Sequence, residues 1–187
     1  MSWAAYYHHF LYDDTLLIVM EPTLRPSRIE KRGQVVALYS DEKLIGINFL
    51  HISDVIKMKA HGRIPYLPSP ILTILNNQLQ NVGFSLLIEQ NHSGFFVGNV
   101  EEVLSEKEVK VIFENQEFVF PYQGTLKKED KVVIALEGTI LFSGEKVLTK
   151  HLCCEEDIGG TGLQTFTIAE PQDVTGKDYF VTPSKNG

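Results

Sequence analysis

The sequence predicts a small α+β domain over residues 1–90 followed by an all-β barrel over residues 91–187. Three observations predict this organisation. A length of 187 residues suits two small domains. The first part combines β-rich runs with one amphipathic helix, whereas the second part shows only short β-rich runs between turns. A polar stretch at 89–93 separates the two textures and marks the expected boundary.

Four segments of the first part have a recognisable pattern. Residues 15–20 are an apolar run of the length of a buried strand. Residues 35–39 and 44–50 are β-rich and predict a hairpin with a four-residue loop at 40–43. Residues 21–32 are polar and hold two prolines, so a connection is expected there. Residues 51–59 could form a short helical piece.

The clearest predicted helix spans residues 71–82. Ser69 suits the N-cap, Pro70 suits the first helical position, and Gly83 suits the stop. The apolar residues on one side of it are Ile71, Leu72, Leu75, Leu79 and Val82. Such a stripe needs a sheet to cover it, and the preceding hairpin supplies one, which predicts the α+β class.

The second part carries short β-rich runs separated by turn clusters. The expected strands are residues 95–103, 108–113, 116–120, 131–136 and 146–154. Strands of this length and spacing indicate a small closed barrel. Gly98 interrupts the first strand, where a glycine often marks a bulge or a barrel corner. The final residues, 183–187, are expected to be a loose tail.

Composition and charge exclude several classes of protein. Apolar residues make up 43% and charged residues 22%, an ordinary globular balance. The sequence shows no membrane span and no secretory signal pattern, and its two cysteines are adjacent, so a cytoplasmic protein without a membrane partner is expected. The net charge of −7 falls wholly in residues 91–187, where nine Lys and no Arg face sixteen acidic residues. This balance disfavours nucleic-acid binding, although a local basic patch remains open.

No motif of catalysis, nucleotide binding or metal binding is present, so a non-catalytic protein without cofactor or metal is expected. His8 and His9 are adjacent and would point to opposite faces of a strand, which favours a surface pair over a chelating pair. Cys153 and Cys154 are adjacent, which favours their interpretation as strand residues, one facing in and one out, over that of a reactive thiol. The glycine-rich stretch at 159–162 favours a turn over an anion-binding nest.

Lysines and aromatic residues of the second part are the candidates for contacts with a nucleic acid. The candidate nucleic-acid-binding residues are Lys127, Lys128, Lys146 and Lys150, close to Lys131. They could line one groove, or they could be solvated turn lysines balanced by Glu129, Asp130 and Glu145. A stacking platform could include one or two of Phe95, Phe96, Phe113, Phe118, Phe120 and Tyr122, most of which a small barrel needs in its core.

The order of these segments resembles the bacterial YtpR family. In the first part the similar segments are residues 6–7, 14–18 (DTLLI), 31–36 (KRGQVV) and 46–49 (GINF). In the second part they are residues 96–101 (FVGNVE) and 131–141 (KVVIALEGTIL). The resemblance implies a domain of unknown role followed by a tRNA-binding barrel of the OB type. Four features of the family pattern are absent: the HPNADKL segment, the GAPN turn, an LRG stretch that is Leu152-Cys153-Cys154 here, and an SGMC motif that is not recognisable in residues 157–163.

Two functions follow from the resemblance. The first is an accessory protein that binds tRNA or another RNA in an OB groove, with lysines on phosphates and aromatic rings under bases. The second is a barrel that has lost RNA affinity and serves as a protein-interaction or dimerisation module, which suits the acidic second part. An enzyme is the third and weakest reading.

Overall fold

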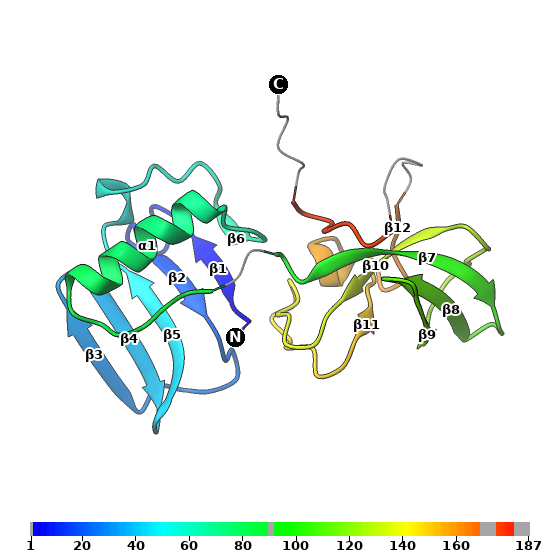
Figure 1. The fold of residues 1–187 in the computed structure, drawn as a ribbon, viewed down its shortest axis with the longest axis horizontal. Coiled ribbons are helices and arrows are strands. Elements are labelled where there is room, and N and C mark those ends of the chain that lie inside the picture. The colour runs from blue at the N-terminus through cyan, green and yellow to red at the C-terminus, as the bar shows by residue number, and fades with distance from the viewer. Residues whose placement is uncertain (1, 90–91, 169–174, 182–187) are drawn as a thin grey trace. The chain divides into compact units, whose positions relative to one another are not determined.

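The computed structural model describes residues 2–89, 92–168 and 175–181, and it divides the chain into two compact units, Met1–Asn91 and His92–Gly187 (Figure 1). The boundary expected from the polar stretch lies one residue earlier. Both units are rich in β-strands, and the second contains a curled, barrel-like sheet. Among the described residues, no helix combines the length and the apolar character needed to cross a membrane.

The first unit is built on a six-stranded antiparallel sheet. Its strands are β1 (Ala4–Tyr7), β2 (Leu16–Val19), β3 (Arg28–Arg32), β4 (Val35–Ser40), β5 (Lys43–Phe49) and β6 (Gly62–Ile64), in the order β3-β4-β5-β2-β1-β6. The expected strands at β2, β4 and β5 are present. Because β3 is a mostly exposed edge strand with a single apolar residue, Ile29, the connection expected over 21–32 was wrong at its end.

The hairpin loop between β4 and β5 is shorter than expected. Ser40 and Lys43 still pair across the two strands, so only Asp41 and Glu42 form the turn. Asp41 takes a left-handed backbone conformation with φ of 52°, which a tight two-residue turn requires. A short 3₁₀ helix, η1 (Ile52–Asp54), lies within the segment expected to be helical.

Helix α1 (Ser69–Asn81) crosses one face of this sheet (Figure 1). Its side chains Leu72, Leu75 and Leu79 are buried in one core with those strand residues that point to the same face. Ser69 was wrongly predicted as the N-cap: Pro68 holds that position, and Ser69 lies inside the first turn, where its carbonyl accepts a hydrogen bond from the Thr73 hydroxyl. The stop at Gly83 is confirmed by its φ of 81°.

The second unit contains the curled sheet. Its strands are β7 (Phe95–Val103), β8 (Glu108–Phe113), β9 (Gln116–Pro121), β10 (Lys131–Ala135), β11 (His151–Leu152) and β12 (Thr167–Ile168). The order is β11-β10-β7-β8-β9, and β12 pairs with β10. Strands β9 and β11, at the two ends of this order, approach each other. The space between β9 and β11 is called the seam below.

The last expected strand, residues 146–154, was wrong in extent. Only His151 and Leu152 pair regularly with β10. Lys146 instead bridges to Ile140, and Cys154 bridges to Thr165. The segment therefore changes partner twice over nine residues, which no periodicity within it could reveal.

Gly98 is needed for close packing rather than for a bulge. The register of β7 and β8 shifts between Val100 and Glu102, two residues beyond this glycine. A Cβ atom at Gly98 would lie 2.7 Å from Val111 Cγ1 and 2.8 Å from Ile134 Cδ1, too close for any side chain. Strands β8 and β10 thus bring their side chains together over the glycine.

The curled sheet carries an apolar cluster on each side. The first cluster includes Val109, Val111, Phe113, Phe120 and Ile134; the second includes Phe95, Val133, Leu141, Val147 and Cys153. Residues 175–181 run beside β7, where the Val97 amide donates to the Lys177 carbonyl at 2.9 Å. The tail expected at 183–187 lies outside the described residues.

Candidate nucleic-acid interface

The four candidate lysines come from two loops of the second unit. Lys127 and Lys128 lie between β9 and β10, and they line a hollow together with Glu101 and Glu102. Lys128 Nζ is 3.9 Å from Glu101 Oε1. Lysines and acidic groups alternate around this hollow, so its charge is balanced and it offers little attraction to a phosphate.

Lys146 and Lys150 lie between β10 and β11, and Lys150 meets an aromatic ring. Its Nζ sits 4.7 Å from the centre of the Phe118 ring, a cation–π contact. Lys150, Phe118 and Glu137 help to line a second hollow of about 490 Å³. Lys146 is half-buried and lines neither of these two hollows. These two hollows therefore separate Lys127 and Lys128 from Lys150.

The aromatic residues of the β8–β9 hairpin face inward. Phe118 pairs with Val111 and Phe120 pairs with Val109, and both valines are fully buried. Phe95 and Phe113 are buried as well, whereas Phe96, Phe118 and Tyr122 are partly buried against the core. Of the six candidates for a stacking platform, Phe118, Phe120 and Tyr122 line hollows that also include a lysine, and Phe118 has Lys150 over its ring.

The outward face of the same hairpin is charged. Lys110 Nζ lies 3.5 Å from Glu102 Oε2 and 3.8 Å from Glu117 Oε2, and Val119 opposite it is 55% exposed. The lysine charge is already compensated on this face. A base-stacking site is therefore not built on the outside of β8 and β9.

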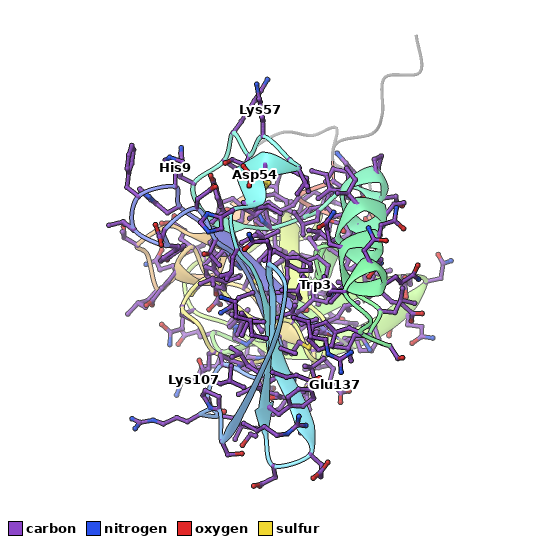
Figure 2. All side chains as sticks on the ribbon, turned by 90° about the vertical axis from the view of Figure 1, so that its left-hand side faces the viewer. Trp3, His9, Asp54, Lys57, Lys107 and Glu137 are labelled. Atoms are coloured by element: carbon purple, nitrogen blue, oxygen red, sulfur yellow. The ribbon has the colours of Figure 1, made fainter. Side chains whose placement is uncertain are left out.

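A third hollow, of about 550 Å³, continues the second one along the seam. The two hollows share Pro121: residues 118–121 and 149–150 line one, and residues 121–123, 151–152 and 154 line the other. Together they form what is called the seam groove below. Lys107 lines its one end and Glu137 its other, and these side chains lie apart in Figure 2. Its walls come from segments about thirty positions apart, so no local pattern in the sequence could reveal it.

A histidine–aspartate pair lies at the Lys107 end of the seam groove. His151 Nε2 is 2.7 Å from Asp157 Oδ2, and the Cys154 amide donates to the same oxygen at 2.9 Å. Asp157 is buried, whereas the His151 side chain is 46% exposed. Burial raises the pKa of the Cys154 thiol; backbone hydrogen bonds from Asp157 and Glu156 oppose this shift, and the Asp157 carboxylate adds to it. Cys154 is therefore a neutral thiol at physiological pH rather than an activated nucleophile.

The remaining candidates have structural explanations. His8 and His9 lie in the turn after β1, where His9 is exposed (Figure 2). In the parts of the chain that the structure describes, no three His, Cys, Asp or Glu side chains are placed to hold a metal ion. The amides of Gly159 and Gly160 donate to the carbonyls of Glu156 and Glu155 at 3.4 and 2.7 Å, which supports a turn there.

One segment of the chain is similar to a known protein family. Residues 22–91 match the model of a domain of unknown function (DUF4479), which lies within the first unit from the β3 side of the sheet through α1. No match was found among curated proteins. The comparisons therefore describe a similarity of the first unit and assign no ligand to either unit.

Proposed function

We propose that the chain is a non-catalytic RNA-binding protein, in which an α+β unit accompanies an OB-type barrel that binds single-stranded segments of tRNA or other RNA. The strand order supports the barrel assignment. Three consecutive strands, β7, β8 and β9, form a meander, β10 returns to pair with β7, and β11 lies between β10 and β9. An OB barrel has five strands in this arrangement and binds oligonucleotides over its strand face and adjoining loops.

The contact between Lys150 and Phe118 carries the proposal. Single-stranded nucleic acids bind where aromatic rings stack on bases and cations neutralise phosphates. Lys150 is exposed beside the ring of Phe118 in the seam groove. A base that stacks on the accessible part of Phe118 would leave its phosphate within reach of the lysine.

The same geometry predicts weak binding. Glu137 lines the groove beside Lys150, and Lys128 and Lys110 already have acidic neighbours. Each lysine that neutralises a phosphate releases counterions and so adds to the affinity for a nucleic acid. One or two lysines therefore contribute only a small part of the binding free energy. Binding at low salt and its loss at physiological salt are expected.

Fluorescence anisotropy with labelled oligonucleotides and with tRNA tests this proposal. Lys150→Ala is expected to weaken binding and to reduce the slope of log affinity against log salt by about 1. Phe118→Leu keeps an apolar core residue and is expected to weaken binding roughly tenfold through lost stacking. Lys128→Ala is the matched control, since its charge is offset by Glu101, and it should change little. No binding of the unaltered protein to any RNA at low salt would refute the proposal.

A protein-interaction module is the second candidate. The Tyr122 amide donates to the Lys107 carbonyl, so the backbone groups of Tyr122 point toward the β8 side of the hairpin. Alternation then directs the amide and carbonyl of Val119 toward the seam, where a partner strand could pair with them. Light scattering after size-exclusion chromatography tests it: a stable dimer that Val119→Glu dissociates would favour this candidate, whereas a strict monomer that binds RNA would exclude it.

A further inference from the structure

We propose that the His151–Asp157 end of the seam groove is a nucleobase pocket, which takes up one unstacked base of the bound RNA. This inference rests on the proposed function and deepens it. The Phe118–Lys150 end would hold the strand regardless of its sequence. The His151–Asp157 end would discriminate among bases.

The pocket is held in shape by hydrogen bonds of its own walls. The Thr165 amide donates to the Gln123 carbonyl at 2.8 Å, and the Gln123 amide donates to Thr165 Oγ1 at 3.2 Å. Cys154 bridges to Thr165 from the other side. The three wall segments are therefore tied together before any ligand arrives, which lowers the entropic cost of binding. A volume of about 550 Å³ is in the range of small-molecule sites.

The pocket offers flat apolar walls for a planar ring. Pro121, Tyr122 and Leu152 line it, and Leu163 lies 66% exposed at its rim. The Tyr122 hydroxyl donates to the Ser105 carbonyl at 2.9 Å, which anchors the far end of the aromatic side chain. A planar base can pack on such walls, whereas a bare phosphate or carboxylate gains nothing from them.

The polar groups of the pocket suit the edge of a base. A carboxylate only accepts hydrogen bonds, so His151 Nε2 carries the proton that is shared with Asp157 Oδ2. In the neutral tautomer that carries this proton, Nδ1 is an acceptor for an amino or imino group. Gln123, whose side-chain amide has both donors and an acceptor, lines the same pocket. Lys107 is exposed at this end and supplies the positive charge for a phosphate attached to the base.

Two titrations test this pocket. Binding to oligo-A, oligo-C, oligo-G and oligo-U is compared, and each nucleoside monophosphate is titrated while backbone NMR shifts are followed. We expect the affinities for the best and worst homopolymers to differ about tenfold, since a specific hydrogen-bonded contact discriminates to that extent. We expect monophosphate shifts at residues 121–123 and 151–157. His151→Ala should bring the four homopolymers within about twofold of one another, whereas Lys150→Ala should weaken all four alike.

The outcomes separate this inference from the proposed function. RNA binding with equal affinity for all four bases, or discrimination that survives His151→Ala, overturns the pocket and leaves the proposed function standing. No RNA binding, together with monophosphate shifts at the pocket, keeps the pocket as a site for free nucleotides and removes RNA as its source. Neither RNA binding nor shifts overturns both. Lys107→Ala, at an exposed position, repeats the test by lowering monophosphate affinity if His151→Ala fails to fold.

Discussion

Each unit contains a buried aspartate beside a half-exposed histidine, and the two pairs are built differently. In the first unit, His9 Nδ1 lies 3.4 Å from Asp14 Oδ1, whereas in the second unit His151 Nε2 lies 2.7 Å from Asp157 Oδ2. Exposure is nearly matched: 48% for His9 and 13% for Asp14, against 46% for His151 and 11% for Asp157. The difference lies in what else binds each carboxylate.

Asp14 is surrounded by donors from the fold itself. The Tyr7 hydroxyl donates to Oδ1 at 2.8 Å, and the Ser53 hydroxyl donates to Oδ2 at 2.6 Å. Burial works to raise the pKa of Asp14, but the hydrogen bonds from Ser53 and Tyr7 outweigh it and hold this pKa below its usual value. Burial, with Asp14 nearby, raises the pKa of Tyr7. Asp14 therefore links three chain segments, and both of its carboxylate oxygens already accept hydrogen bonds from the fold, which leaves little capacity to bind a ligand.

The Asp157 carboxylate forms hydrogen bonds with residues close to it in sequence, and Asp157 lines a hollow. Its partners His151 and Cys154 are close in sequence, and all three line the same pocket. A buried carboxylate with donors from several segments stabilises a fold, whereas one that orients a half-exposed histidine in a pocket can help to bind a ligand. The following changes test that distinction and the independence of the two units.

Truncation of one core leucine or isoleucine in each unit should give the largest effects. Leu75→Ala and Ile134→Ala each remove a fully buried side chain and leave a cavity, at a cost of about 2–5 kcal/mol in the free energy of unfolding. Because the two side chains belong to separate clusters, Leu75→Ala should lower only the protection of amides in the first unit against hydrogen exchange, and Ile134→Ala only those in the second. Equal loss in both units would show that the two units unfold together.

Asp14→Ala should destabilise the first unit by about 2–4 kcal/mol. It leaves the Tyr7 and Ser53 hydroxyls without their acceptor, and it places alanine in a left-handed conformation with φ of 53°. Urea denaturation measures the effect. Asp14→Asn is the control, because asparagine tolerates that φ, and its loss should be smaller. His151→Ala in the second unit should cost far less stability. A comparable loss would contradict the different roles given to the two histidine–aspartate pairs.

The pH dependence of stability follows from the same carboxylate. Since the pKa of Asp14 is lower in the folded protein, its contribution is complete above the ordinary aspartate pKa of about 3.9. The contribution is lost as the pH falls through the lower pKa of the folded state. Acid titration of urea stability should show a loss below about pH 4 that Asp14→Asn reduces. An unchanged acid limb in this variant would refute the role given to Asp14.

Gly98→Ala should destabilise the second unit by about 1–3 kcal/mol, because its Cβ would overlap Val111 and Ile134. The matched test is the double variant with Val111→Ala, which removes the Cγ1 atom that lies 2.7 Å from the new Cβ. The cost of the double variant should be less than the sum of the two single costs, by thermal or urea denaturation. Strict additivity would mean that the close approach is not the reason for this glycine.

Phe10→Ser and Leu11→Ser should have the smallest effect, within about 0.5 kcal/mol. These side chains are 84% and 75% exposed in the loop that Asp14 holds in place, so folding buries little of their apolar surface. Thermal denaturation of each variant measures the change. A loss of more than about 1 kcal/mol would show that the two residues are covered in solution.

Much of the second unit could be predicted from sequence, and its site could not. Strands β7 and β8 have the predicted bounds, and β9 and β10 differ by one residue. Alternation and turn residues are local signals, and Glu114 and Asn115, both with positive φ, form the predicted turn. The lysines were chosen from local density, which could not predict the contact of Lys150 with an aromatic ring, because Phe118 lies 32 positions away.

The strand-rich texture, the amphipathic helix with its glycine stop and the uneven distribution of charge could all be predicted from the amino-acid order, because they depend on neighbours along the chain. Long-range folding settles which charges are compensated, which aromatic rings face inward and where a groove opens. Those properties depend on pairing between distant segments: the β9–β11 approach brings Lys150 to Phe118, and the partner changes of residues 146–154 place His151 and Asp157 in one pocket.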